Sequence, residues 1–286
     1  MRHTAIAFAF VSMIVFLVLT PHSVAGTVAY YRFEEGTPNA TASGAGNVLD
    51  SSGNGLNGTA LNGPVYRSAV PVPTVPQTGA PNNLSMQFAG TGQTRVFIPD
   101  SSQFSITHSL TIEAYFNVTA IPNFAGSIFF RGDDRNGFDP YFLNVEPGLI
   151  RFGIGDASNN SALVTAPLPG FNQWIFAAGV LDTTNHTMSL YVNGALANTI
   201  STNIIPLGPL VSTEEPGVAI GGHPSTFYGD FMTFDGLIDE VRLSDTALTP
   251  SQFIDAPEPV ALSGIAVLCV LGHRRRVKCS PTNSAR

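Results

Sequence analysis

The chain has 286 residues, of which only 12% are charged, and its formal net charge is −7. An acidic chain repels nucleic-acid phosphates and anionic lipids, so the charge argues against nucleic-acid binding. The 28 Gly, 21 Pro and 20 Phe are typical of short, core-rich strands joined by frequent turns, and not of a helical protein. Both cysteines, Cys269 and Cys279, lie near the C-terminus, so no disulfide can join the strands.

The first 25 residues have the layout of a secretory signal peptide. Arg2 precedes an apolar run from Ala5 to Leu19, and the small residues Ser23 and Ala25 fit the groove of signal peptidase. The alternatives are an uncleaved signal anchor or a buried helix, but the run is short for a membrane span of about 20 residues. We therefore predict cleavage after Ala25 and export of the chain.

The roughly 230 residues between the two ends suit one large β-sandwich, which we place at residues 26–255. Apolar or alternating segments are separated there by Gly, Pro, Asn and Asp, as an antiparallel sandwich requires. Asn193-Gly194 predicts a type I′ hairpin turn, because both residues tolerate positive φ. The stretch from Pro64 to Pro81 is rich in proline, and we expect it to be an exposed insertion. The expected strands are Val28–Phe33, Ser85–Phe88, Arg95–Ile98, Leu110–Val118, Gly126–Arg131, Tyr141–Val145, Leu149–Ile154, Trp174–Asp182, Thr187–Val192, Val218–Ile220 and Gly236–Leu243.

An acidic loop between two expected strands is a candidate ligand-binding site. In one interpretation its carboxylates bind calcium or sugar hydroxyls, while an aromatic side chain stacks on a sugar ring. In the other, the loop is a solvated hairpin tip. The candidate ligand-binding residues are Asp133, Asp134, Phe138, Asp139 and Tyr141.

The last 31 residues, 256–286, have three parts. Pro257-Glu258-Pro259 precedes an apolar run from Val260 to Gly272, and the cluster Arg274-Arg275-Arg276 follows. This layout resembles the PEP-CTERM sorting signals of bacteria. The resemblance implies a short hydrophobic helix that sits transiently in the inner membrane and is cut near the tripeptide by an exosortase-type protease. An apolar run followed by arginines also inserts with its cations inside. The alternative is an amphipathic helix packed on the domain, which the two prolines disfavour.

Several segments, taken in order, resemble the LamG-like jelly-roll family of the concanavalin A-like lectin and glucanase fold. They cover nearly everything from Val28 to about Phe253. The resemblance implies two curved antiparallel sheets packed face to face, with a carbohydrate-binding or adhesive role. The matching segments are Ala29–Gly36, Asp50–Gly58, Ser85–Gly90, Ser109–Phe116, Trp174–Gly179, Ser189–Gly194, Ala219–Gly222, Phe234–Leu243 and Ala247–Thr249.

A structural calcium site is the cofactor that we expect. Asp50 and Asn54 lie in a Gly-rich turn that offers the oxygen ligands preferred by Ca²⁺, and the resemblance implies that Asp239 joins them. The alternative is an Asx-turn at Asp50 and an ion pair between Asp239 and Arg242. The residues leave both readings open.

No segment has the spacing of a catalytic site. Retaining glucanases need two carboxylates about 5 Å apart, on alternating positions of one strand. Glu34-Glu35 and Glu214-Glu215 are adjacent pairs, which would point to opposite faces of a strand. The sequence also lacks a His-Glu-x-x-His or Gly-x-Ser-x-Gly motif. We therefore predict a protein that is not an enzyme.

These features predict an exported, all-β jelly-roll of two antiparallel sheets that binds a glycan or an envelope component. Its expected place is the cell envelope, the outer surface or the extracellular space, and its processing partners would be signal peptidase and an exosortase. The alternatives are a structural matrix protein without a discrete ligand and, less favoured, a glycoside hydrolase or lyase. An aromatic and polar groove on the concave sheet would favour binding, and two converging carboxylates would favour hydrolysis.

Overall fold

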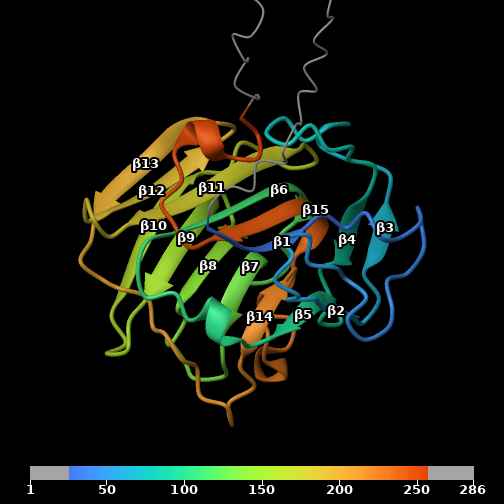
Figure 1. Ribbon diagram of the computed structural model, residues 1–286. Helices are drawn as coiled ribbons and strands as arrows, with labels where there is room; N and C mark the ends of the chain where they lie inside the picture. The colour runs from blue at the N-terminus through green and yellow to red at the C-terminus, as the bar shows by residue number, and fades with distance from the viewer. Residues whose placement is uncertain (1–25, 257–286) are drawn as a thin grey trace, which may run out of the picture.

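The computed structural model describes residues 26–256, which form two antiparallel β-sheets packed face to face (Figure 1). The strands are β1 (Thr27–Tyr31), β2 (Thr59–Leu61), β3 (Val65–Arg67), β4 (Ser85–Ala89), β5 (Arg95–Pro99), β6 (Leu110–Ala120), β7 (Gly126–Gly132), β8 (Tyr141–Glu146), β9 (Leu149–Gly155), β10 (Ser161–Pro167), β11 (Ile175–Asp182), β12 (Thr187–Val192), β13 (Ala195–Ser201), β14 (Gly217–Ile220) and β15 (Asp235–Ser244). Short 3-10 helices span Ser102–Phe104, Thr226–Tyr228 and Pro250–Gln252.

The eight-stranded sheet runs β13-β12-β11-β6-β15-β4-β3, and β1 also pairs with β15. The seven-stranded sheet runs β10-β9-β8-β7-β14-β5-β2. Neighbours in both sheets are antiparallel, and many are far apart in the sequence. The expected all-β, two-sheet antiparallel jelly-roll is therefore confirmed.

The core lies between the two sheets and follows the two-residue period of the strands. Along β6, Ile112, Phe116 and Val118 are fully buried. Phe129 and Phe152 contribute the same kind of side chain from the opposite sheet. Burying each of these large apolar side chains stabilises the fold by about 1.5–3 kcal/mol. A core of this kind needs no disulfide between the sheets.

The Asn-Gly turn is confirmed, since Asn193 and Gly194 join β12 to β13 with φ of 49° and 77°. The exposed insertion expected between Pro64 and Pro81 is wrong in part. The paired strand β3 lies inside it, and Val75 is fully buried. Strands β2, β10 and β13 were also missed, because they are short or mostly exposed and lack a clear apolar alternation.

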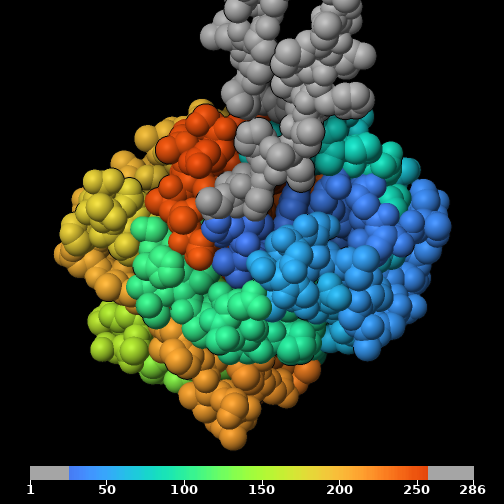
Figure 2. Space-filling view, in the orientation of Figure 1, coloured from blue at the N-terminus to red at the C-terminus, as the bar shows by residue number. Residues whose placement is uncertain are grey.

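The outer face of the eight-stranded sheet is partly covered by the end of the described chain. Phe253 packs against Phe176 on β11 and Tyr191 on β12, with ring centroids 5.9 and 5.1 Å away. Figure 2 shows this segment in red, beside the yellow β12–β13 hairpin. The covering segment forms a second, smaller apolar cluster outside the main core.

Within residues 26–256, no helix is long and apolar enough to cross a membrane. The predicted signal peptide ending at Ala25 lies outside the described residues. So do the tripeptide Pro257-Glu258-Pro259, the expected hydrophobic helix and the cluster Arg274-Arg275-Arg276. Processing at both ends therefore stays a prediction.

Candidate functional site: an aromatic pocket on the seven-stranded sheet

A pocket of about 280 Å³ lies on the outer face of the seven-stranded sheet. Its floor is formed by strands β7, β8 and β9, and its walls by the loops that precede β7, β8 and β15. We call it the aromatic pocket. It is lined by Phe124, Phe130, Asn136, Gly137, Asp139, Phe142, Asn144, Arg151, His223, Tyr228, Phe231 and Met232.

The alternation of β8 places two side chains in the floor. Leu143 and Val145 are fully buried between the sheets. Phe142 and Asn144 therefore point to the outer face. Arg151 on β9 pairs in register with Asn144, which puts its side chain on the same face. The floor thus combines an aromatic ring, an amide and a guanidinium.

Phe142 lies flat across the floor because its neighbour on β9 is Gly153. A Cβ atom at Gly153 would lie only 2.2 Å from the Phe142 ring, so any other residue there would displace the ring. On its other side, Phe142 stacks on Phe130 with a centroid distance of 5.4 Å and an interplanar angle of 12°. The guanidinium of Arg151 lies 5.9 Å from the Phe142 ring centroid. A glycine and two rings therefore define the floor.

The wall before β15 is fixed to the sheet by backbone hydrogen bonds. The amide of Ser127 donates to the Met232 carbonyl at 2.9 Å, and the chain carries Phe231 to the rim. Phe231 stacks on Phe124 with a centroid distance of 4.8 Å and an interplanar angle of 5°. Since Phe231 and Phe124 are 48% and 50% exposed, they present an apolar surface to solvent at the mouth of the pocket.

Two titratable groups in the pocket have shifted pKa values. Burial, followed by the nearby Asp133 carboxylate, raises the pKa of Asp139 to about 6. Burial lowers the pKa of His223 to about 4, and its Nδ1 accepts a hydrogen bond from the Ser225 amide at 3.1 Å. At neutral pH the pocket therefore contains an ionised Asp139 and a neutral His223.

Two buried polar atoms of the floor lack a hydrogen-bond partner among residues 26–256. They are Oδ1 of Asn144, whose residue is 1% exposed, and Nε of Arg151. An unsatisfied buried polar group costs about 1–3 kcal/mol, so a native protein keeps one where it serves a purpose. An acceptor and a donor side by side match the hydrogen-bonding needs of a ligand hydroxyl.

The structure places the predicted ligand-binding residues in different surroundings. Asp139 lines the aromatic pocket, so the acidic composition of its loop correctly predicted one residue of the site. Asp133 is buried and forms an ion pair with Arg135, which also covers the Phe138 ring. Tyr141 is fully buried, and its hydroxyl donates to a core carbonyl at 2.6 Å, so its ring has no free face.

Asp134 lies at the edge of the same loop, where its amide donates to the Glu214 carbonyl at 2.8 Å. The loop is therefore tied to the segment before β14 rather than projecting as an isolated hairpin tip. Of the predicted residues, only Asp139 belongs to the pocket lining. Sequence reasoning missed the aromatic wall, because its members come from separate loops with no common motif.

The predicted calcium ligand Asp50 is surrounded by donors of the chain itself. Its Oδ1 accepts from the amides of Tyr30 and Ser52, and its Oδ2 accepts from the Ser52 hydroxyl and the Leu56 amide, all within 3.0 Å. The side-chain amide nitrogen of Asn54 donates to the carbonyls of Thr27 and Val28 on β1. The Asx-turn at Asp50, one of the two readings, is confirmed.

Asp239 lies in a different environment on β15. Its Oδ2 accepts from Asn82 at 2.9 Å, and burial, followed by the adjacent Glu240 carboxylate, raises its pKa well above the usual range. The alternative prediction, an ion pair between Asp239 and Arg242, is wrong, because Arg242 pairs with Glu113. Within residues 26–256, no group of three or more His, Cys, Asp or Glu side chains is placed to hold a metal. Asp50, Asn54 and Asp239 therefore share no ligand set as placed, and calcium binding stays a prediction.

Comparison with known proteins identifies the fold. Residues 90–253 match a family described as "Concanavalin A-like lectin/glucanases superfamily". No curated protein sequence matches the chain.

Three solved structures illustrate the similarity. The binding domain of Paraclostridial Mosquitocidal Protein 1 is 13% identical, with a TM-score of 0.55 over 80% of this chain and 51% of that one. The botulinum neurotoxin serotype G binding domain is 11% identical, with a TM-score of 0.56 over 80% and 50%. The binding domain of botulinum neurotoxin DC, in complex with SialylT, is 12% identical, with a TM-score of 0.52 over 81% and 50%. The chain spans about half the length of these structures, and identities this low show a common fold alone.

Proposed function

The chain belongs to the concanavalin A-like lectin/glucanase superfamily, and on this premise we propose that it is a binding module that holds a saccharide in the aromatic pocket. Solved structures of the same fold are described as binding domains, and one is in complex with SialylT. The observation that carries the proposal is Oδ1 of Asn144, a buried acceptor without a partner at the base of an aromatic-lined pocket.

The chemistry of the pocket fits a sugar ring. The apolar C–H face of the sugar ring would lie on the exposed ring of Phe231, because aromatic side chains offer a large rigid surface. Ring hydroxyls would donate to Oδ1 of Asn144 and to the Asp139 carboxylate, and accept from Arg151. The volume of about 280 Å³ lies near the small end of ligand pockets, so a terminal part of a saccharide is the expected ligand.

The same pocket supports binding over the two alternatives. A matrix protein without a discrete ligand has no need for a recessed aromatic and polar site. A glycosidase needs two carboxylates at the cleavage point, whereas Asp139 is the one carboxylate among the lining residues described. The export of this module to the envelope or beyond is part of the proposal and rests on the sequence patterns at both ends.

A glycan array followed by calorimetric titration of the best ligand tests the proposal, using Phe231→Ala and the matched control Phe171→Ala. Phe231 and Phe171 are equally exposed, at 48%, but only Phe231 lines the pocket. Removing one stacking ring should weaken binding by about tenfold, or 1.4 kcal/mol, while the control binds as the wild type does.

Three outcomes count against the proposal. If no saccharide binds, the matrix-protein alternative gains. Equal losses in both phenylalanine variants would mean that binding does not use the pocket. Cleavage of the bound saccharide, abolished by Asp139→Asn, would identify a hydrolase instead.

A further inference from the structure

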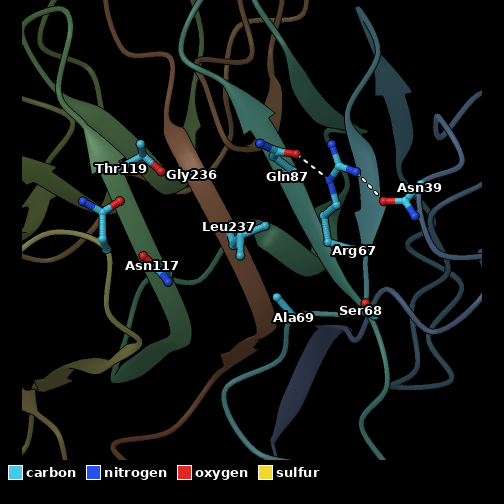
Figure 3. A pocket seen from close by; sticks show the side chains of 10 residues that line it. Asn39, Arg67, Ser68, Ala69, Gln87, Asn117, Thr119, Gly236 and Leu237 are labelled. Carbon is cyan, nitrogen blue, oxygen red and sulfur yellow. Dashed lines mark hydrogen bonds between the residues drawn. The ribbon is translucent and has the colours of Figure 1, made fainter.

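A second recess lies on the outer face of the eight-stranded sheet, on the opposite side of the sandwich from the aromatic pocket. It crosses strands β3, β4, β15 and β6 and has a volume of about 490 Å³ (Figure 3). We call it the polar groove. Its character differs from that of the aromatic pocket, because its lining contains no aromatic side chain and no carboxylate.

Arg67 on β3 is the one cation among the lining residues described, and two amides hold its guanidinium in place. Its Nε donates to Oε1 of Gln87 on β4 at 2.6 Å, and one terminal nitrogen donates to Oδ1 of Asn39. Figure 3 shows Arg67 between these two partners. A guanidinium that is held in this way loses little conformational entropy when it binds a ligand.

The direction of the two amides follows from chemistry. Arginine has donors only, so the amide oxygens of Gln87 and Asn39 must face Arg67, and their NH₂ groups must face away from it. Within residues 26–256, these two NH₂ groups and the second terminal nitrogen of Arg67 have no hydrogen-bond partner. The groove therefore offers a cluster of donors around one positive charge.

Arg67 forms no ion pair within residues 26–256. The ion pairs formed within residues 26–256 involve other arginines. A donor cluster with an uncompensated positive charge is complementary to an anion, and a planar carboxylate fits a guanidinium best.

The rest of the groove indicates what the anion is attached to. The lining also contains Asn117 and Thr119, which lie on β6 across Leu237 from Arg67 (Figure 3). Asn172 is a further lining residue with a hydrogen-bonding side chain. The apolar side chains are limited to Leu237 and Ala69, too little to form a pocket for a peptide side chain. A lining made mainly of amides and hydroxyls matches the hydroxyls of a sugar instead.

We propose that the polar groove binds an acidic saccharide, with a uronate carboxylate on Arg67, Gln87 and Asn39 and ring hydroxyls on Asn117, Thr119 and Asn172. This site does not depend on the proposed function of the aromatic pocket, since the two are lined by different sheets. Together they would let one module contact two chains, or two parts of one chain, from opposite faces. The ligand class differs as well, because stacking rings are absent from the groove lining.

The test is a calorimetric titration of the full chain with an oligomer of galacturonic acid. The matched probe is the same oligomer with its carboxylates reduced to alcohols. We expect Arg67→Gln to weaken binding of the acidic oligomer by at least about tenfold. Arg67→Lys should retain part of the wild-type affinity, because lysine keeps the positive charge but lacks the paired planar donors of a guanidinium. Arg135→Gln is the control, since it removes a positive charge that lies outside the groove. The thermal midpoint of each variant shows whether it is folded.

Each other outcome overturns the proposal. If the reduced oligomer binds as tightly as the acidic one, the carboxylate plays no part in recognition. Equal binding of an oligomer of glutamic acid would assign the groove to acidic peptides, and complete competition by inorganic sulfate alone would reduce it to a small-anion site. Wild-type affinity in folded Arg67→Gln, or no binding of the acidic oligomer to the wild type, would leave the groove without this ligand. Loss of saccharide binding in Phe231→Ala bears on the aromatic pocket only.

Discussion

Glu113 and Arg242 form a buried ion pair between β6 and β15, and this pair also holds the end of the described chain. Their side chains are 0% and 2% exposed. Oε2 of Glu113 accepts from the Ile254 amide at 3.0 Å, and Arg242 donates to the Gln252 carbonyl at 2.7 Å. Burial raises the pKa of Glu113, and the Arg242 charge opposes that shift. The segment that covers the outer face of the eight-stranded sheet is therefore fastened by a charged pair beneath it.

Replacing Glu113 by Ala should destabilise the protein by about 3–5 kcal/mol, because it leaves the Arg242 charge buried without a partner. Urea unfolding measures this loss. The double variant Glu113→Leu/Arg242→Met should lose less than either single variant, since no charge remains to be buried. A single variant as stable as the wild type would show that the pair does not hold the segment.

The raised pKa of Asp139 predicts how stability depends on pH. The folded state keeps the Asp139 proton up to about pH 6, whereas the unfolded chain loses it near pH 4. The contribution of Asp139 to the free energy of unfolding is fully present below about pH 4 and is lost as the pH rises through about 6. Asp255, with a pKa of about 6, acts in the same direction.

Asp139→Asn should therefore flatten the fall in unfolding free energy between about pH 4 and pH 6, as measured by urea unfolding at several pH values. Asp133 and Tyr228 lie near this carboxyl, and the variant keeps both residues. An unaltered slope would mean that Asp139 titrates normally.

Saccharide binding should strengthen as Asp139 ionises, because a carboxylate is a stronger acceptor than a neutral carboxyl.

The Asp50 turn gives two testable expectations, one for stability and one for the predicted calcium site. Asp50→Ala removes the acceptor for the amides of Tyr30, Ser52 and Leu56, and it should cost about 1–3 kcal/mol for each amide left buried and unsatisfied. Asp156→Ala is the control, because Asp156 makes the same kind of turn at an exposed site. A thermal midpoint that is equal in calcium and in chelator would mean that the Asx-turn is the whole role of Asp50. A rise with calcium that Asp50→Ala abolishes would instead establish a metal site.

Export predicts a defined N-terminus. Expressed from its full coding sequence in a bacterium, the protein recovered outside the cytoplasm should begin at Gly26, as determined by intact mass and N-terminal sequencing. The variant Ala25→Arg should block cleavage, because signal peptidase accepts only small residues at that position. Recovery of uncleaved protein that begins at Met1 would favour the signal anchor instead.

The strands that were predicted correctly share a visible signal. Alternating or continuous apolar residues mark β6 and β11, and Asn193-Gly194 marks the hairpin that follows β12. Strand β3 gave no such signal, because it has only three residues, follows Pro64 directly, and only Tyr66 points into the core. Strand β13 is exposed almost throughout and is held by pairing to β12 rather than by burial. Patterns of burial predict strands that bury a face, and these two bury little.

The sequence predicted one residue of the candidate site, Asp139, and missed the others. Asp139 stood out because an acidic, Gly-containing loop between strands commonly carries ligand contacts. Phe124, Phe231 and Asn144 come from three segments that only the antiparallel pairing of the seven-stranded sheet brings together. Asn144 sits in a strand that otherwise looks like plain core, so nothing in its sequence context shows that its oxygen lacks a partner.

The central claim concerns Asn144, and the variant Asn144→Leu tests it through two measurements on one sample. Leucine has nearly the same shape, so replacing an unsatisfied buried amide should leave the unfolding free energy unchanged or raise it. The affinity for the saccharide found on the array should nevertheless fall by at least about tenfold, because the ligand loses the acceptor at the base of the pocket. Loss of binding without loss of stability is the predicted result, and wild-type affinity in the stable variant would contradict the account.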